Sequence, residues 1–256
     1  MKTQQFNKLH QQAEPLMICN VWDVASAKAA EKQNFKAIGT SSAAIASMLG
    51  YEDGEQITFE ELLFIVKRIV ACSKLPLTVD IEAGYSEDPL VTANYIKMLA
   101  EVGVVGVNVE DSQVNETRQL KNANTFAGYL LAIKGQLVKD QIDIFINVRT
   151  DVFLLGEGDA VAETQRRAKL YEAAGADGLF VPCITQTEDI LSVINATELP
   201  VNVMCMPELP DFKTLAGLGV KRISMGNFLF DKLQGSFGVI LNDIQRDKSF
   251  KSVFSI

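Results

Sequence analysis

The sequence predicts an α/β fold, a single parallel eight-stranded (β/α)8 barrel of the TIM type, and three observations support this prediction. Eight short apolar runs rich in β-branched residues alternate with amphipathic helical patterns along the chain. The length of 256 residues is about that of one such barrel. Most of the runs also end in polar side chains, as barrel strands do where they reach the face that carries the chemistry.

The eight apolar runs are the predicted strands, which in a barrel are parallel and buried on both faces. They are Leu16–Trp22, Ala37–Ser42, Leu77–Glu82, Val104–Asp111, Ile144–Asp151, Gly178–Cys183, Val201–Met206 and Arg222–Gly226. An open doubly wound sheet is the competing fold for alternating strands and helices. If it bound a dinucleotide, we would expect a GxGxxG turn after an early strand, and the sequence contains none.

Capping residues mark the ends of the predicted helices. Thr58 and Glu61 form a capping box, and Asp88 is followed by a proline at the first helical position. Glycines stand where a left-handed helix end is expected, just before a strand, at residues 103, 175 and 219. The helix that opens at Thr58 carries one apolar stripe, made of Phe59, Leu62, Leu63, Val66, Ile69 and Val70. The last helix is predicted from Phe228 to about Asp247.

The barrel is predicted to be a single domain over residues 1–256, because no linker, low-complexity stretch or composition shift marks a second one. The first 13 residues place Phe6 and Leu9 on one helical face. We expect this segment to form a short lid over the bottom of the barrel, where the strands begin.

Composition argues against several kinds of partner and location. A net charge of -8 and a pI near 4.8 disfavour binding to nucleic acid or to an anionic membrane. No run reaches the roughly 18 apolar residues of a membrane span, and the polar first residues lack the hydrophobic region of a secretory signal. A cytoplasmic protein is therefore expected. The cysteines lie in apolar runs without CxxC spacing, so we expect buried thiols at Cys19, Cys72, Cys183 and Cys205.

Carboxylates gather at the ends of the third and fourth predicted strands. Asp80 and Glu82 lie two residues apart and so share one side of a strand, and Glu110 ends the next strand. Converging carboxylates repel one another unless a cation is present, and an all-oxygen ligand set favours Mg²⁺ or Mn²⁺ over zinc. From the residues alone, the alternative remains that these acids are surface groups or helix caps.

Further polar residues at the strand ends predict a pocket at the same face. Buried polar side chains are costly unless they are paired, so a pocket explains this set better than packing does. Asn147, Arg149 and Asp151 share a strand face, where the guanidinium of Arg149 would suit a carboxylate or phosphonate. The alternative is that Arg149 pairs only with a neighbouring acid.

The residues that are missing narrow the chemistry. The only histidine, His10, lies in the polar N-terminal segment, so a histidine base and a catalytic triad are disfavoured. No lysine lies near the C-terminal end of a predicted strand, which disfavours a Schiff-base aldolase. A divalent cation, carboxylates and an arginine remain, and they suit stabilisation of an enolate formed from a small anionic 2-oxo acid.

Motifs at successive strand ends resemble the phosphoenolpyruvate mutase and isocitrate lyase superfamily from about residue 15 to about residue 230. The order of the matches along the chain makes the set specific. The matching segments are Asn20–Ala27, Thr40–Ala44, Leu49–Asp53, Asp80–Tyr85, Asn108–Asp111, Ile146–Asp151, Phe180–Pro182 and Gly219–Ser224.

This resemblance implies a role for individual residues of the chain. Asp80 would coordinate Mg²⁺ directly, with Glu82 and Glu110 acting mainly through waters. Ser41, Ser42 and Ala43 would form a backbone amide cradle for the carboxylate or phosphonyl oxygens of the substrate, with Arg149 opposite. Trp22 would wall the pocket, Asp53 would enter from the loop after the second strand, and Asn147 and Asn202 would line it. Arg149, Asp53 and Glu110 are the residues assigned to catalysis.

Members of this superfamily usually act on pyruvate-like compounds, and many are tetramers of dimers that exchange the last helix. The resemblance therefore implies a Mg²⁺-dependent homo-oligomer, a dimer or tetramer, that makes or breaks a C–C bond beside a 2-oxo or 2-hydroxy acid. P–C bond chemistry, as in a phosphonopyruvate hydrolase or a phosphonomutase, is one alternative. A barrel that binds a dicarboxylate without turning it over is another.

The sequence departs from the superfamily pattern in three places. Residues 112–121 replace the Lys-Lys-Cys-Gly-His loop of the lyases, although Arg118 or Lys121 could close over the substrate. After the sixth strand, the sequence Val181-Pro182-Cys183-Ile184 lacks both the glutamate of the methylisocitrate lyases and the histidine of the mutase. The second acid of the metal motif is Glu82 instead of aspartate. No proton donor is evident, and Asp53 and Cys183 are the candidates.

Overall fold

The computed structural model describes residues 2–156 and 158–254, and eight parallel strands in it close into a barrel. In chain order the barrel strands are β1 (Leu16–Val21), β2 (Ala37–Thr40), β3 (Leu77–Asp80), β4 (Gly106–Glu110), β7 (Phe145–Arg149), β8 (Gly178–Val181), β9 (Val201–Met204) and β10 (Arg222–Ser224). β10 pairs with β1 and completes the circle. The predicted (β/α)8 fold is confirmed, and each strand lies inside its predicted run.

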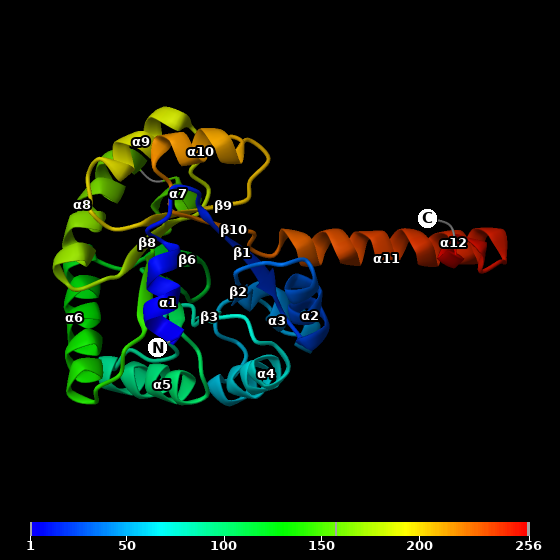
Figure 1. Cartoon of the computed structure of the whole chain (residues 1–256), viewed down its shortest axis with the longest axis horizontal. Coiled ribbons are helices and arrows are strands. Elements are labelled where there is room, and N and C mark those ends of the chain that lie inside the picture. The colour runs from blue at the N-terminus through cyan, green and yellow to red at the C-terminus, as the bar shows by residue number, and fades with distance from the viewer. Residues whose placement is uncertain (1, 157, 255–256) are drawn as a thin grey trace.

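Most of the helices surround the barrel, whereas the last two project away from it (Figure 1). They are α1 (Lys2–Leu9), α2 (Val24–Lys32), α3 (Ser42–Leu49), α4 (Phe59–Cys72), α5 (Pro89–Glu101), α6 (Ala123–Lys139), α7 (Val152–Leu155), α8 (Ala160–Ala173), α9 (Thr187–Ile194), α10 (Phe212–Leu218), α11 (Phe228–Asp247) and α12 (Lys251–Phe254). A separate antiparallel hairpin, β5 (Ser112–Val114) and β6 (Arg118–Leu120), follows β4 and was not predicted.

The predicted capping residues hold the helix ends. The Thr58 hydroxyl accepts a hydrogen bond from the backbone N–H of Glu61, and the Glu61 carboxylate accepts one from the N–H of Thr58. Asp88 caps α5 in the same way through the N–H of Leu90, at 2.9 Å. Gly103, Gly175 and Gly219 have φ between 91° and 104°, which an L-residue adopts only with strain.

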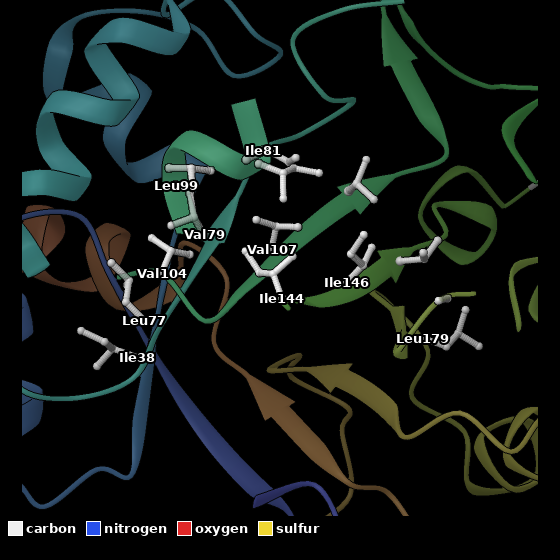
Figure 2. Packing of buried hydrophobic residues seen from close by; sticks show 14 of the residues in the cluster. Ile38, Leu77, Val79, Ile81, Leu99, Val104, Val107, Ile144, Ile146 and Leu179 are labelled. Carbon is white, nitrogen blue, oxygen red and sulfur yellow. The ribbon is translucent and has the colours of Figure 1, made fainter. Parts of the chain in front are cut away.

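Alternating side chains divide the interior into two regions. Apolar residues such as Val79, Val107 and Ile146 point outward from the strands and pack against the helices, as Figure 2 shows around Leu99 of α5. Each such buried side chain contributes roughly 1.5–3 kcal/mol to folding. The inward positions of β3, β4 and β7 are instead polar, which places the hydrogen-bonding groups inside the barrel.

The barrel bottom is covered by α1. Phe6 is fully buried and packs with Leu16, Ala37, Val105 and Phe145 at the beginnings of the strands. His10 follows it and stacks on the ring of Phe145, at 4.4 Å between centroids, while its Nδ1 lies 3.1 Å from the carbonyl oxygen of Phe6. The only histidine is therefore buried at the bottom of the barrel, far along the strands from their C-terminal ends.

The last long helix, α11, has the predicted bounds but leaves the barrel (Figure 1). It packs mainly against α12, and Phe230 is its single buried residue. Its exposed apolar side chains include Leu229, Leu233, Phe237 and Leu241. An apolar groove of about 370 Å³ lies beside β10, lined by residues that include Met17, Met206, Leu209, Phe212, Ile223 and Met225.

The prediction that all four thiols are buried is wrong. Only Cys19 is buried; Cys72 and Cys183 are partly exposed and Cys205 is exposed. The reason is that β9 ends at Met204, one residue before Cys205, so the apolar run continues past the barrel wall. Among the described residues, no helix is both long enough and apolar enough to span a membrane.

Candidate functional site

A cavity of about 220 Å³ opens at the C-terminal ends of the strands. Six of the residues predicted for the site line it, namely Ser41, Ser42, Ala43, Asp53, Asp80 and Arg149. They come from β3, β7, the start of α3 and the loop that follows α3. The volume equals that of roughly seven water molecules at about 30 Å³ each. The cavity therefore suits a small acid.

The start of α3 forms one wall of the cavity. Ser41 caps this helix through its hydroxyl, which accepts a hydrogen bond from the N–H of Ala44 at 3.3 Å. The first N–H groups of a helix have no partner within it, and the helix dipole adds partial positive charge there. The Ser41–Ala43 segment is therefore arranged to receive an oxyanion.

Asp80 is held in place by three hydrogen bonds at the end of β3. Its backbone N–H donates to the Thr40 hydroxyl at 2.8 Å, and its two carboxylate oxygens accept from the Ser42 hydroxyl and from the N–H of Glu82. Burial raises the pKa of Asp80, and the charge of Arg149 opposes that rise. The carboxylate is thus fixed at the cavity wall.

Glu82 faces the loop after α3 instead of continuing along the strand. Its backbone has a φ of 48°, and its Oε2 accepts a hydrogen bond from the N–H of Glu55 at 2.7 Å. Burial, together with the charges of Asp53, Asp80 and Glu110, raises its pKa to about 8. The acids are therefore close enough to repel one another.

Glu110 lies between two arginines. Its Oε2 is 3.0 Å from Nη1 of Arg149, and its Oε1 contacts Nη1 of Arg118. Burial nevertheless raises the pKa of Glu110 to about 7, helped by the nearby charges of Asp151 and Asp80. Burial by itself would lower the pKa of Arg149, but the negative charges of Glu110 and Asp151 have the larger effect. The pKa of Arg149 is therefore raised.

Asp151 connects this group to the hairpin. It is completely buried and accepts hydrogen bonds from Nε of Arg149 at 2.6 Å, from Nη1 of Arg118 at 3.1 Å and from the hydroxyl of Ser112. Nη2 of Arg118 also lies 3.3 Å from a carboxylate oxygen of Asp53. Arg149 is therefore paired with acids and also lines the cavity, and its contact with a carboxylate or phosphonate of the substrate stays a prediction.

Asp111, the acid next to Glu110, belongs to a different group. It points away from the cavity and accepts hydrogen bonds from Arg167 at 2.9 Å and from the hydroxyls of Tyr171 and Thr150, each at 2.7 Å. A buried carboxylate with this many donors anchors α8 to the barrel. Its role is structural.

The donor set fits a hard cation bound largely through water. In the part of the chain that the structure describes, no three histidine, cysteine or acidic side chains converge closely enough to coordinate one metal ion directly. The carboxylates of Asp80, Glu82 and Glu110 are nevertheless close enough to raise the pKa of Glu82. Mg²⁺ usually keeps several waters and takes one or two carboxylates, so this spacing agrees with it better than with a closed cage.

The remaining predicted residues lie outside the cavity wall. Asn147 and Asn202 are fully buried beneath it, and Trp22 packs edge-on against Phe230 at 5.1 Å between ring centroids. Their contact with substrate stays a prediction. Cys183, with a φ of 64°, follows the lining residue Pro182.

Apart from Arg118, which was expected to close over the substrate, several residues of the site were given no role from the sequence. Arg118, Asn108, Phe180 and Leu154 line the cavity, while Glu55 and Asp151 hold other site residues. Asp151 carried a usable signal, because it lies two residues after Arg149. Leu154 and Glu55 carried none, since their places depend on how α7 and the loop after α3 fold.

Comparisons with known proteins agree with this geometry. The profile of the phosphoenolpyruvate phosphomutase family matches residues 6–245. The 2-methylisocitrate lyase of Shewanella oneidensis is 30% identical over 184 residues, covering 69% of this chain and 61% of its own length. The oxaloacetate decarboxylase of Ectopseudomonas mendocina is 27% identical over 217 residues, covering 81% and 72%.

A solved structure from Burkholderia cenocepacia, described as a candidate phosphonomutase, superposes with a TM-score of 0.88. It is 36% identical and covers 94% of this chain and 99% of its own. The chain therefore belongs to the phosphoenolpyruvate phosphomutase family, within the phosphoenolpyruvate mutase and isocitrate lyase superfamily.

Proposed function

We propose that this protein is a Mg²⁺-dependent enzyme that breaks or makes a C–C bond next to the carboxylate of a small 2-oxo or 2-hydroxy acid. One observation carries the proposal: the wall of the 220 Å³ cavity combines the carboxylates of Asp53 and Asp80 with the guanidinium of Arg149 and the N–H groups at the start of α3. This polarity matches a substrate that binds a cation with some oxygens and the protein with others. Lyases and decarboxylases among the relatives support the same class.

The residues of the chain have distinct roles in this proposal. The Ser41–Ala43 amides bind the substrate carboxylate, and Arg149 neutralises charge that develops on the oxygens during bond cleavage. Asp53 lines the cavity, with a carboxylate oxygen 3.3 Å from Nη2 of Arg118, and in its protonated form it is the proposed proton donor to the carbon left by cleavage. A substrate that fills the small cavity would displace much of its water, which would strengthen these charge interactions.

Asp80, Glu82 and Glu110 would hold the metal, Asp80 directly and the glutamates mainly through waters. When bound, Mg²⁺ would supply positive charge that stabilises an enolate-like oxygen. Mn²⁺ has the same preference for oxygen ligands and is expected to replace it. Binding of either cation would also be favoured because it relieves the mutual repulsion of the three carboxylates.

P–C bond chemistry is the second candidate, favoured by the similarity to the candidate phosphonomutase. A phosphonate would bind to the same amides and to Arg149, so the cavity alone does not distinguish the two reactions. They are distinguished by which substrate the enzyme turns over.

The test is a substrate panel with the purified full chain. Oxaloacetate, 2-methylisocitrate, dimethylmalate and phosphonopyruvate are each incubated with Mg²⁺ or with excess chelator, and pyruvate is followed by a coupled dehydrogenase. The spontaneous decarboxylation of oxaloacetate is subtracted. We expect chelator-sensitive pyruvate release from one of the three carbon acids. Release from phosphonopyruvate alone would establish the P–C alternative, and a protein that binds Mg²⁺ but turns over none of the four acids would favour a non-catalytic barrel.

Asp80→Ala tests the role of the metal site. We expect at least a hundredfold loss of activity, because the proposed direct ligand is removed. Asp143→Ala is the matched control, since Asp143 is exposed at the opposite end of the barrel wall, just before β7. Full activity in Asp80→Ala would refute the metal mechanism.

We also propose that the protein is a homo-oligomer in which α11 of one copy packs on a second copy. An exposed apolar stripe on α11 and an apolar groove beside β10 are complementary in character. The first turn of α11 already lines this groove through Phe228 and Leu229, and a dimer or tetramer would bury the rest of the groove and of the stripe.

A further inference from the structure

A row of amides lies inside the barrel directly beneath the cavity. Asn108 of β4, Asn147 of β7 and Asn202 of β9 occupy it, with Arg222 of β10 beside them. The interior of a (β/α)8 barrel is usually filled by branched apolar side chains. Polar groups at this depth therefore need a reason beyond filling space.

Arg222 is the least satisfied member of the row. It is 1% exposed, and its one hydrogen bond runs from Nη2 to Oδ1 of Asn108 at 3.3 Å. Its Nε and Nη1 are buried and have no partner among the described residues. Burial lowers its pKa only to about 9, so the guanidinium stays charged at neutral pH. A guanidinium can donate hydrogen bonds but cannot accept them.

These contacts fix the orientation of the Asn108 amide. Nδ2 of Asn147 donates to Oδ1 of Asn108 at 2.9 Å and to Oδ1 of Asn202 at 3.2 Å. Nδ2 of Asn202 in turn donates to the carbonyl oxygen of Val203, which can only accept. The carbonyl oxygen of Val203 at one end of the row requires a donor, and the guanidinium of Arg222 at the other end requires an acceptor. Both requirements are met only when the three side-chain amides have the orientation described here. Oδ1 of Asn108 takes both donors and cannot turn toward the cavity.

The group of Asn108 that remains free is Nδ2. Among the described residues it makes no hydrogen bond, and Asn108 lines the cavity. Asn108 is also the register partner of Asp80 on the neighbouring strand. A donor is thus presented at the cavity floor, next to the carboxylate proposed to bind the metal.

We infer that Asn108 is a substrate-binding residue whose Nδ2 donates a hydrogen bond to an oxygen of the bound acid, with Arg222 and Asn147 holding it in that orientation. This inference rests on the proposed function, because it assumes that the cavity binds a small oxyanion. The recognised group is a carboxylate or enolate oxygen, which would accept a hydrogen bond from Asn108 and would also be available to coordinate the metal.

Two substitutions separate this role from a purely structural one. Asn108→Asp gives Arg222 a carboxylate partner and so should stabilise the fold, but it removes the donor and places a negative charge against the anion. Asn108→Leu removes the donor as well, but leaves Arg222 with no partner and should destabilise the fold. If Asn108 had only a structural role, the stabilised variant Asn108→Asp would bind the anion as well as wild type and only Asn108→Leu would bind it poorly. Our inference predicts that both variants bind the anion poorly.

The experiment measures the Kd of oxalate by isothermal titration calorimetry in the presence of Mg²⁺, together with the melting temperature. Thr78→Val is the matched control, because it removes a buried hydroxyl that has no partner and that does not line the cavity. We expect the Kd to rise at least tenfold in both Asn108 variants and to stay within twofold of wild type in Thr78→Val. We expect a higher melting temperature for Asn108→Asp and a lower one for Asn108→Leu.

The outcomes separate this inference from the proposed function. Wild-type affinity for oxalate in Asn108→Asp would overturn the role of Asn108 while leaving the proposed function intact. A wild-type protein that binds neither oxalate nor any acid of the substrate panel would overturn the proposed function, and this inference with it.

Discussion

Single residues in this site are held by neighbours that are distant in sequence. Glu82 is oriented by Glu55, 27 residues earlier, and Asp80 by Thr40, 40 residues earlier. The residue types and their two-residue spacing predicted the acidic cluster. The turn of Glu82 toward Glu55 could not be predicted, because it depends on a left-handed backbone conformation that sequence spacing does not reveal.

The raised pKa values of Glu82 and Glu110, about 8 and about 7, predict how stability depends on pH without metal. Between about pH 5 and pH 8 the folded protein keeps protons that the unfolded chain has released, so the free energy of unfolding falls as pH rises. Melting curves in chelator should therefore shift to lower temperature across this range. Mg²⁺ should stabilise the protein most near pH 8, where both glutamates ionise.

Glu82→Gln is the variant that tests this. Its melting temperature in chelator should change less between pH 5 and pH 8, and its gain on adding Mg²⁺ should be smaller. An unchanged pH profile in this variant would show that Glu82 does not titrate in the range.

His10 predicts the opposite dependence at acid pH. Burial lowers its pKa from 6.5 to about 3, and the charge of Arg222 adds to this. As pH falls below 6.5 the unfolded chain takes up a proton that the folded protein refuses, so stability is lost. At pH 5 the loss is about 2 kcal/mol in the free energy of unfolding.

His10→Phe keeps an aromatic ring against Phe145 and removes the titration. Chemical denaturation at pH 7 and pH 5 should show a smaller fall in stability for this variant than for wild type. Equal falls in the two proteins would exclude His10 as the cause.

At the scale of elements, local signals predicted most of the structure. The capping box at Thr58, the cap at Asp88 and the glycines before strands act within one turn of a helix, so the sequence alone reveals them. The β5–β6 hairpin was missed because its strands are three residues each and Arg118 ties it to acids from three other segments. Such ties are set by the tertiary fold.

Arg118 is expected to keep the hairpin ordered. Arg118→Gln removes its pairs with Glu110, Asp151 and Asp53, so backbone amides in residues 112–120 should exchange roughly tenfold faster, which corresponds to about 1.4 kcal/mol. Hydrogen exchange measured by mass spectrometry provides the test. Glu116→Gln, at the exposed turn of the hairpin, is the control and should exchange like wild type.

At the scale of the whole molecule, the eight strands and their order could be predicted from the alternation of apolar runs and helical patterns. The direction in which α11 leaves the barrel could not be predicted from the sequence. Its sequence is equally compatible with packing on its own barrel, and only the three-dimensional arrangement shows the apolar stripe uncovered.

Leu233→Glu tests the proposed assembly. A charge on the stripe of α11 should weaken association, so light scattering should show a shift toward the monomer at micromolar concentration. Gln234→Glu adds the same charge one position around the helix and should leave the mass unchanged. A wild-type protein that is monomeric at high concentration would contradict the proposal.

The pairing of β1 with β10 also has a consequence for folding kinetics. The barrel cannot close until the strand at residues 222–224 has been synthesised, since its partner lies about 200 residues earlier. Contacts of such long sequence separation form slowly, and unpaired strand edges are prone to aggregation while they wait. Until β10 is added, the nascent chain is therefore expected to form an open sheet. Its unpaired edges are β1 and β9, the two neighbours of β10, and these strands are the segments most in need of chaperone protection.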